Sequence, residues 1–335
     1  MPRLSLIPPA AVLLLLLLTL GGDSAVRGKR PVLGSDTRIS AIPIPLDAED
    51  PKRVRAGALR YLGGWELKGR DPAFGSFSAM IAEPDRLTLL NDAGGVVTLR
   101  LAARGGIAGV AFGDLPGGPG GSYYKYTRDS ESMTRDRTDG RIWIGFEGRN
   151  AIYRYDAGLT RVEAGARPAA MRRWPGNGGA EAMVRLGSGR FLVFSERAAG
   201  PPGAPEALIF DRDPTDPTAQ VARFFYRPPD GFRVTDAAEL PDGRLLILHR
   251  RLAFWPIASA AVSLLDPRRI APGEIALGKV IATLEPPLAV DNMEALGVVR
   301  EGAETIVWIA SDDNFRAPFQ RNLLLKFALD ERAAD

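Results

Sequence analysis

Short runs of about five apolar residues recur along the chain and are separated by turns rich in glycine and proline. Three of these runs follow a glycine turn directly, in TDGRIWIGF, GSGRFLVFS and PDGRLLILH. A glycine turn followed by β-branched and aromatic residues is typical of a β-hairpin. Beyond the N-terminal segment, no long stretch keeps the apolar period of an amphipathic helix. The pattern therefore predicts an all-β protein with little helix.

A longer repeat contains these hairpins. The phrases FGSFSAM, DSESM, GGAEAM, VTDAAEL and VDNMEAL each precede a hairpin strand, and the residues that align in them are Ser78, Glu131, Glu181, Asp236 and Glu294. Their spacings of 53, 50, 55 and 58 residues suit one four-stranded blade of a β-propeller with long loops. The segment 36–67 lacks the phrase but is strand-like, and it suits a sixth blade that shares strands with RNLLLKFAL to close the ring. We predict a single propeller over residues 36–330 with six blades, five and seven being the alternatives.

Acidic residues occupy the start of each predicted inner strand. The inner strands of a propeller line a central channel, so we expect Glu131, Glu181, Asp236 and Glu294 to form a ring at one mouth. The next strand of each blade ends in a second set of polar groups, at Asn91–Asp92, Glu147, Glu196, His249–Arg250 and 312–314. Clustered carboxylates repel one another unless a cation or a proton neutralises them, and Ca²⁺ accepts such oxygen ligands.

These considerations predict a site for calcium, with another divalent ion as the alternative, and with the ligands Glu131, Glu181, Asp236, Glu294, Asp312 and Asp313. Two other ways to neutralise the ring are arginines that reach inward, with Arg128, Arg197 and Arg250 as candidates, and protonation of the acids. A further alternative is that the acids cap turns and have only a structural role.

Composition removes several classes of site. The chain of 335 residues has no cysteine and one histidine, so disulfides, thiol nucleophiles and histidine-rich zinc or iron sites are excluded. The net charge of +3 comes from interspersed acids and bases, which does not favour nucleic-acid binding. Arg3 followed by an apolar run over 10–20 is typical of a signal peptide, which we place at residues 1–25. We expect a periplasmic or secreted monomer, bound to a membrane only if this segment is not cleaved.

Five phrases in order, DSESM…GFEGRNAIYRYD, NGGAEAM, TDAAELPDGRLLILHRR, DNMEALGV and IASDDNF, resemble the phytase-like domain family described as having esterase-like activity. The resemblance extends from Phe74 to Phe327. It implies a β-propeller, often exported in bacteria, that hydrolyses esters or phosphoesters. Propeller phytases themselves, which are more loosely related, hold several calcium ions that bind phosphate with clustered acids. The positions that match the acidic phrases are Glu131, Glu147, Glu181, Glu196, Asp236, Glu294, Asp312 and Asp313.

The chemistry that these residues favour is metal-assisted ester hydrolysis. The chain has no G-x-S-x-G elbow, and a serine triad would have to join His249 to Ser132 or Ser195. A calcium ion held by the acidic ring would instead position a small anionic or ester substrate and polarise its ester group. We predict Glu131, Glu181 and His249 as catalytic residues. Arg128, Arg250, Glu147 and Glu196 are predicted to bind substrate.

Two further functions remain open at this point. A sugar-lactonase-like propeller would hold one divalent ion through Glu131, Asn177, Asp236 and Asp291. A non-enzymatic propeller would instead bind a ligand or a partner through its long loops, among them the one that contains SYYKY (122–126). Chelation separates these classes, because only a metal-dependent enzyme loses turnover with its ion.

Overall fold

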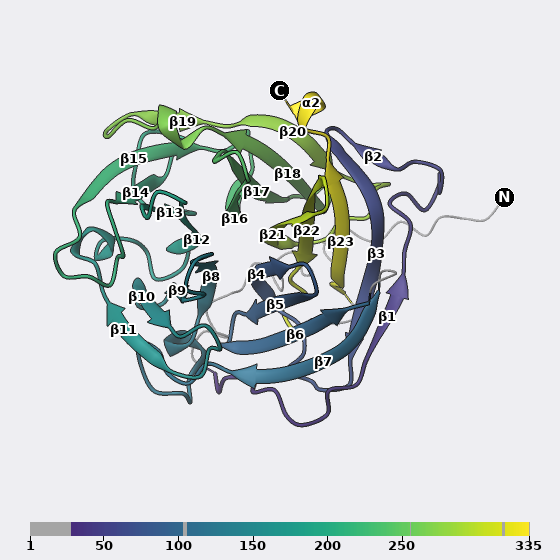
Figure 1. Ribbon diagram of the computed structural model, residues 1–335, viewed down its shortest axis with the longest axis horizontal. Helices are drawn as coiled ribbons and strands as arrows, with labels where there is room; N and C mark the ends of the chain where they lie inside the picture. The colour runs from purple at the N-terminus through teal and green to yellow at the C-terminus, as the bar shows by residue number, and fades with distance from the viewer. Residues whose placement is uncertain (1–27, 103–105, 255, 317–318, 335) are drawn as a thin grey trace.

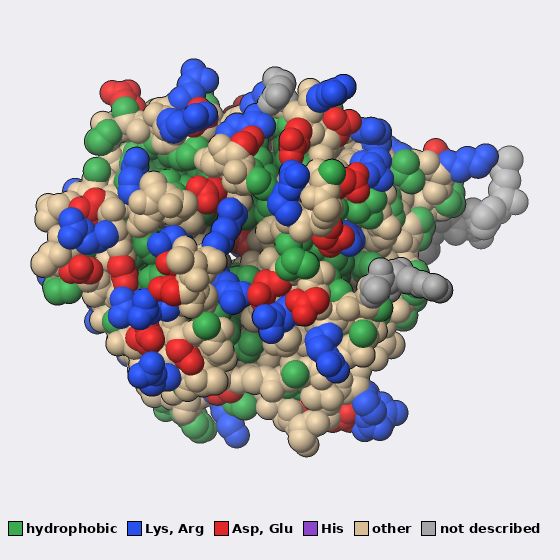
Figure 2. All heavy atoms as spheres, in the orientation of Figure 1, with side chains coloured by type: hydrophobic (Ala, Val, Ile, Leu, Met, Phe, Trp, Pro, Cys, Tyr) green, Lys and Arg blue, Asp and Glu red, His purple; other side chains and the backbone are tan. Residues whose placement is uncertain are grey.

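The computed structural model describes residues 28–102, 106–254, 256–316 and 319–334, so the predicted signal segment lies outside the described residues. The described chain forms five β-sheets around a central axis, and each sheet has one edge at the axis and the other at the rim (Figure 1). This is a five-bladed β-propeller, and the predicted all-β propeller fold is confirmed. On the face viewed in Figure 2, side chains of both charges surround a hollow at the centre of the disc.

Four of the blades are built outward from the axis by strands in chain order, except that one strand between the last two strands of the fourth blade joins the edge of the third. The first contains β4 (Phe77–Glu83), β5 (Arg86–Asn91), β6 (Gly95–Leu101) and β7 (Ile107–Asp114). The second contains β8 (Ser130–Arg135), β9 (Ile142–Phe146), β10 (Ala151–Tyr155) and β11 (Val162–Ala166). The third contains β12 (Ala180–Arg185), β13 (Phe191–Ser195), β14 (Glu206–Phe210), β15 (Val221–Arg227) and the parallel edge strand β19 (Ile275–Leu277). The fourth contains β16 (Arg233–Glu239), β17 (Leu245–Leu252), β18 (Ala258–Leu265) and β20 (Lys279–Leu284).

The fifth blade joins the two ends of the described chain. Its inner strands are β21 (Met293–Glu301), β22 (Glu304–Ser311) and β23 (Asn322–Leu329), and its outer strands are β3 (Leu59–Gly69) and β1 (Ile39–Pro43), with the short β2 (Arg55–Ala56) beside β3. The antiparallel pairing of β23 with β3 runs from Asn322–Leu67 to Leu329–Leu59 and closes the ring. The expected sharing of strands with RNLLLKFAL is therefore confirmed. The blade count is five rather than six, because segment 36–67 completes this sheet and forms no sheet of its own.

Helix is scarce among the described residues. It consists of 3₁₀ turns at Lys125–Thr127, Ala169–Met171 and Pro267–Arg269, and of the four-residue helix α2 (Glu331–Ala334). None of the helices in the described ranges has the length and apolar character needed to cross a membrane.

Apolar side chains between neighbouring blades hold the ring together. Five buried clusters occupy the five interfaces between blades, and each takes residues from two adjacent sheets. At the closure, buried Trp308 of β22 stacks on Trp65 of β3 with ring centroids 6.1 Å apart. This packing explains why the strand sequences are rich in large apolar residues on both faces.

The turn residues identified in the sequence have the expected conformation. Gly140, Gly189 and Gly243 each close the first hairpin of a blade with a positive φ, of 78°, 86° and 84°. A side chain at these positions would be strained, which accounts for the repeated glycine. All five inner strands begin at one mouth of the channel, which we call the start mouth, and end at the opposite mouth, the end mouth.

Candidate functional site

A β-bulge at the beginning of every inner strand positions the first set of polar side chains. The pairing of the inner strand with the second strand skips one residue in each blade, and the skipped residues are Ser78, Glu131, Glu181, Thr235 and Glu294. An extra residue of this kind is left out of the ladder and bends the strand, which redirects its side chain. The bulge carries a carboxylate in the second, third and fifth blades and a hydroxyl in the other two.

The hydroxyl bulges hold neighbouring blades together instead of joining the acids. Ser78 Oγ donates to the carbonyl of Ser130 at 2.6 Å, and Thr235 Oγ1 donates to the carbonyl of Met293 at 3.2 Å. These bonds connect inner strands of adjacent blades at the start mouth.

A second set of side chains follows the bulges at equivalent positions, where each second strand reaches the same mouth. Its members, in blade order, are Asp92, Glu147, Glu196, Arg250 and Asp312. Four of the five are acids. Together with Asp129 and the three bulge glutamates they form the acidic cluster, which we define as Asp92, Asp129, Glu131, Glu147, Glu181, Glu196, Glu294 and Asp312.

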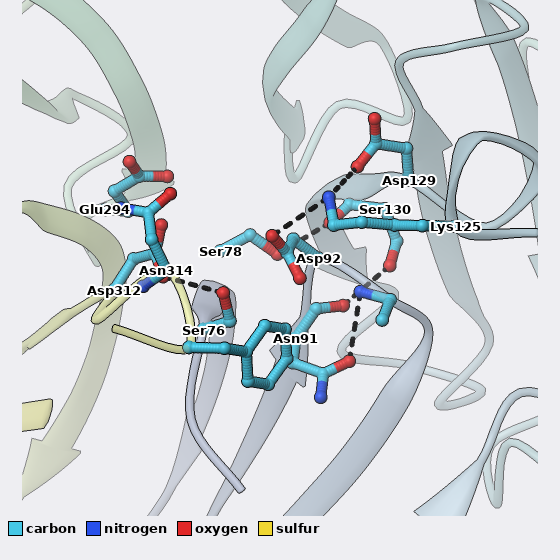
Figure 3. Close-up of polar contacts among 12 residues, drawn as sticks. Ser76, Ser78, Asn91, Asp92, Lys125, Asp129, Ser130, Glu294, Asp312 and Asn314 are labelled. Carbon is cyan, nitrogen blue, oxygen red and sulfur yellow. Dashed lines mark hydrogen bonds and ion pairs between the residues drawn. The ribbon is translucent and has the colours of Figure 1, made fainter. Parts of the chain in front are cut away.

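Lys125 neutralises one side of the acidic cluster. Its Nζ lies 2.6 Å from Asp129 Oδ1 and 3.0 Å from Asp92 Oδ2, and Figure 3 shows it pointing between these two carboxylates. Burial opposes the charge of this lysine, but Asp92, Asp129 and Glu131 outweigh it and raise the pKa of Lys125 well above its usual value. Oδ1 of Asp92 is buried without a hydrogen-bond partner, so the pairing leaves one oxygen of this carboxylate unsatisfied.

Arg250 neutralises the opposite side. Its Nη1 lies 2.7 Å from Glu294 Oε1, and its Nη2 lies 3.3 Å from Glu196 Oε1. Arg197 and Arg233 also contact Glu196, at 2.7 and 3.3 Å. Burial favours the neutral form of Glu196, yet these three cations lower the pKa of the carboxyl below its usual value.

Asp312 is held by neutral groups. It accepts hydrogen bonds from Ser76 Oγ at 2.8 Å, from the backbone N–H of Asn314 at 2.6 Å and from Asn292 Nδ2 at 3.3 Å. Burial, followed by the charges of Glu294 and Asp92, raises the pKa of Asp312 well above its usual value. Figure 3 shows Asp312 beside Glu294, across from Lys125.

Asp129 also belongs to a compact group of three acids, with Glu131 and Glu147. One carboxylate oxygen each from Asp129, Glu131 and Glu147 lies within 4.8 Å of the others. Glu147 accepts from the backbone N–H groups of Gly178 and Gly179, whereas the carboxylate of Glu131 has no hydrogen bond or ion pair to any described residue. Burial, then Asp129 and Glu181, raises the pKa of Glu131 well above its usual value.

Glu147 and Glu181 are neighbouring carboxyl groups. Burial and then neighbouring carboxylates raise the pKa of both groups well above the usual value. The backbone N–H of Gly179 favours the ionised form of Glu147, whereas the charge of Glu147 disfavours the ionised form of Glu181.

The charges of the site do not balance. The acidic cluster contains eight carboxyl groups, and the described basic side chains that contact it are Lys125, Arg250, Arg197 and Arg233, so this part of the chain carries 4 − 8 = −4 when fully ionised. Repulsion of this kind must be relieved by protons or by bound cations.

Comparison with known proteins agrees with this architecture. A family model for phytase-like proteins, described as "Esterase-like activity of phytase", matches residues 72–315. The chain belongs to the phytase-like family. The search of curated proteins found no match.

Solved structures similar to the phytase-like chain are distant. The Malassezia sympodialis allergen Mala s 1 matches with 14% identity, 90% of this chain, 96% of that chain and a TM-score of 0.43. Myxococcus xanthus glutaminyl cyclase matches with 9% identity over 76% of this chain and 92% of that chain, with a TM-score of 0.42. Kuenenia stuttgartiensis hydrazine synthase matches with 13% identity over 72% of this chain and a TM-score of 0.37. The match covers 57% of that chain, which is little more than half of its length.

Asp236 lies outside the acidic cluster of the phytase-like domain. Its Oδ1 accepts from the N–H of Ala237 at 2.8 Å, and its Oδ2 accepts from the N–H of Leu296 at 2.7 Å. The sequence alignment placed Asp236 at the bulge, but the bulge residue is Thr235, one position earlier. A shift of one residue turns a strand side chain to the other face, so this carboxylate bonds to backbone in the neighbouring blade.

Asp313 also has a structural position. It accepts from the N–H groups of Ser76 and Phe315, at 2.9 and 3.1 Å, and from Asn322 Nδ2 at 2.8 Å. These bonds tie the loop after β22 to the first blade. Of the six predicted metal ligands, Glu131 and Glu181 have no ion pair with a described basic residue, Glu294 pairs with Arg250, and Asp312 is held by neutral hydrogen-bond donors.

His249 lies away from the acidic cluster. Its Nδ1 is 3.1 Å from the carbonyl of Ala261, which can only accept, so Nδ1 carries the proton and Nε2 accepts from Tyr226 Oη at 2.9 Å. Burial lowers the pKa of His249 to about 4, which keeps the ring neutral. The hydroxyls of Ser132 and Ser195 donate to the carbonyls of Ala180 and Glu206, so neither forms a triad with His249.

Arg128 points away from the acids as well. A Cβ built on Gly118 would lie 2.7 Å from its Nη1, which places the guanidinium under the glycine-rich loop after β7. The expected lactonase-like ligand set is also not assembled. Asn177 is exposed, and Asp291 accepts from Arg321 at 3.2 and 3.4 Å.

Three members of the site were missed in the sequence, namely Asp129, Lys125 and Arg233. Asp129 stands two residues before Glu131 in the quoted phrase DSESM, so its alternation with Glu131 was available as a signal. No sequence signal identifies Lys125, because the 3₁₀ turn at Lys125–Thr127, which directs its side chain toward the acids, is not apparent from the residues.

Proposed function

We propose that this phytase-like propeller is an exported, divalent-cation-dependent hydrolase of esters or phosphoesters, with its active site at the start mouth. The observation that carries the proposal is the group formed by Asp129, Glu131 and Glu147, in which a half-buried carboxylate without a partner stands beside two buried ones. Such a group is costly to maintain for stability alone, which supports a binding role.

The donor set fits calcium. Oxygens bound to one Ca²⁺ at about 2.3–2.6 Å lie at most about 5 Å apart, and the three carboxylate oxygens lie within 4.8 Å of one another. All the donors are hard oxygens, and the unsatisfied Oδ1 of Asp92 is a fourth candidate. We therefore assign Asp129, Glu131 and Glu147 as the residues that would hold the ion, with Glu181 beside them.

When bound, the cation would orient the ester and polarise its carbonyl or phosphoryl group. The chain's own contribution is a proton held at the start mouth. Glu181, whose pKa is raised by burial and by the charges of Glu147 and Glu196, would hold this proton and supply it to the leaving oxygen. Glu147 retains the complementary charge through its bonds to Gly178 and Gly179.

The charge balance ranks the substrates. With Glu181 protonated the site carries 4 − 7 = −3, and one divalent cation changes it to −1, so a neutral carboxylic ester or a lactone meets less repulsion there than a phosphomonoester dianion. Two cations would be needed to cancel the charge before a phosphate could enter. We therefore place carboxylic esters and lactones first and phosphoesters second.

The test is hydrolysis of p-nitrophenyl acetate and p-nitrophenyl phosphate by the mature protein, with added Ca²⁺ or with EDTA. We expect calcium-dependent turnover of the acetate, and a loss of at least tenfold in Glu131→Gln and in Glu181→Gln. The exposed Glu274→Gln serves as the matched control and should keep the wild-type rate. Bound calcium without turnover of any ester or lactone would instead favour the non-enzymatic, ligand-binding propeller.

A further inference from the structure

The end mouth of the channel contains a cavity separate from the acidic cluster. It has a volume of about 490 Å³ and is lined by the last residues of all five inner strands and the turns that follow them. A hollow with side chains of both charges around it is visible at the centre of the disc in Figure 2. A cavity of this volume is within the range that holds a small organic molecule.

The lining of this cavity is basic. Its charged residues are the arginines 135, 137, 185 and 300 and the glutamates 83 and 239, which gives 4 − 2 = +2. Both glutamates are already engaged. Glu83 pairs with Arg86 and Arg135, and Glu239 accepts from the backbone N–H of Gly187 at 2.9 Å. Arg185 is likewise paired, with Asp136 at 2.7 Å. The lining of this cavity is therefore opposite in sign to the acidic cluster, and Arg137 and Arg300 are its arginines without a buried carboxylate partner.

Arg137 extends across the mouth from the second blade to the fourth. Its Nη2 donates to the carbonyl of Glu239 at 2.8 Å, and its Nη1 lies 3.9 Å from Glu239 Oε2. These contacts use part of a guanidinium whose side chain is 63% exposed. Arg300, from the fifth blade, donates Nη1 to Thr305 Oγ1 at 3.2 Å, has the same atom 3.6 Å from Oε1 of the exposed Glu331, and is also exposed. Each guanidinium has five N–H donors, so both retain donors for an incoming anion.

The walls between the arginines are apolar. Ile81, Ala82, Ala238, Val298 and Val299 line the cavity and are only partly buried, so a ligand can still cover them. An inorganic anion would leave these side chains in water, and a neutral apolar molecule would leave the arginines without a counterion. Both features are satisfied by one chemical class, an organic anion with an apolar body.

We propose that the end mouth binds a small amphipathic anion, a phosphate monoester or carboxylate with a short aliphatic chain. The anionic group contacts Arg137 and Arg300 at the rim, and the chain lies along the apolar walls. Charge complementarity and the exposed apolar lining carry this assignment, which is independent of the ester hydrolysis proposed for the start mouth.

The test is calorimetric titration of the mature protein with octyl phosphate, below its micelle concentration and in EDTA. Chelation keeps the start mouth free of cations, so an anion is repelled there. We expect saturable binding, at least tenfold weaker in the double variant Arg137→Ala/Arg300→Ala. The matched control Arg212→Ala/Arg268→Ala removes the same charge from residues outside the cavity and should bind as wild type does.

Three results would overturn the proposal: no binding of octyl phosphate at millimolar concentration, equal weakening in the two double variants, or binding of inorganic phosphate as tight as that of octyl phosphate. If the double variant fails to fold by circular dichroism, the single charge reversal Arg137→Glu replaces it, because this side chain lies on an exposed turn. That variant should also lose at least tenfold in affinity.

Discussion

Replacing Arg250 by methionine tests how the acidic cluster is held in a folded protein. Arg250 is the cation shared by Glu196 and Glu294, and the exposed fractions of these three side chains are 20%, 2% and 9%. Removal of one partner from a buried ion pair leaves an uncompensated charge, unlike the loss of a surface pair, which costs about 0–1 kcal/mol. Glu196 keeps Arg197 and Arg233, so Glu294 bears most of the loss.

The magnitude follows from the protonation of Glu294. Burial already raises the pKa of Glu294, and Arg250 is the strongest influence that lowers it, so removal of Arg250 raises this pKa further above the usual 4.5. A carboxyl that stays neutral in the folded protein costs at most about 3 kcal/mol at pH 7, which is 2.5 pH units above 4.5, and at most about 0.7 kcal/mol at pH 5. A group whose folded pKa is raised stabilises the fold relatively more at low pH and less as the pH rises. The destabilisation by Arg250→Met should therefore grow from pH 5 to pH 7.

The assay is chemical denaturation of wild type and Arg250→Met in EDTA at both pH values. The double variant Arg250→Met/Glu294→Gln removes the uncompensated charge as well and should recover most of the loss at pH 7. Arg60→Met, which breaks an exposed pair with Glu304, is the control and should cost at most about 1 kcal/mol. A loss below 1 kcal/mol at pH 7, or the same loss at both pH values, would refute this reasoning.

Three other perturbations address neighbouring parts of the structure. The pKa of His249 is lowered to about 4, so between pH 6.5 and pH 4 the unfolded chain binds a proton that the folded protein does not. As the pH is lowered from 6.5 to 4, wild type should therefore lose about 3 kcal/mol more of its free energy of unfolding than His249→Gln does, measured by chemical denaturation. Lys125→Met leaves Asp92 and Asp129 uncompensated and should lower the melting temperature in EDTA, with a larger recovery on adding Ca²⁺ than wild type shows; an equal recovery would argue against a cation site beside this lysine. Asp236→Asn weakens bonds to two backbone N–H groups and should cost about 1–3 kcal/mol in denaturation while leaving calcium affinity within twofold, since a larger drop in affinity would return this residue to the metal site.

The architecture was accessible from the sequence because it depends on local signals that repeat. The glycine turns, the five-residue apolar runs and the spacing of the acidic phrases all report on one supersecondary unit, and they predicted the propeller. The blade count needed long-range information. Whether segment 36–67 forms its own sheet or adds strands to another depends on the pairing of β3 with β23. The sequence of a strand does not show which other strand it pairs with.

The site was only partly predictable, for a reason of register. Alignment of the phrases located Glu131, Glu181 and Glu294 at the bulges, but it placed Asp236 where Thr235 belongs. Because alternate residues face opposite sides of a strand, an error of one position exchanges a channel residue for a blade-packing one.

Buried cations were the other difficulty. Lys125 and Arg250 decide which acids are free to bind an ion, and their reach depends on side-chain paths between blades. A residue list gives the acids but not their partners, so the group of Asp129, Glu131 and Glu147 emerges only from the assembled ring.

The most direct test of the central claim, that the start mouth holds a divalent cation through Asp129, Glu131 and Glu147, is calorimetric titration of chelator-treated mature protein with Ca²⁺. For wild type and Glu274→Gln we expect saturable binding of at least one ion per chain. Glu131→Gln should reduce the affinity at least tenfold, since it removes a charged ligand without enlarging the cavity. Absence of binding in wild type, or the same affinity in Glu131→Gln, would contradict the account and leave the acidic cluster a structural role.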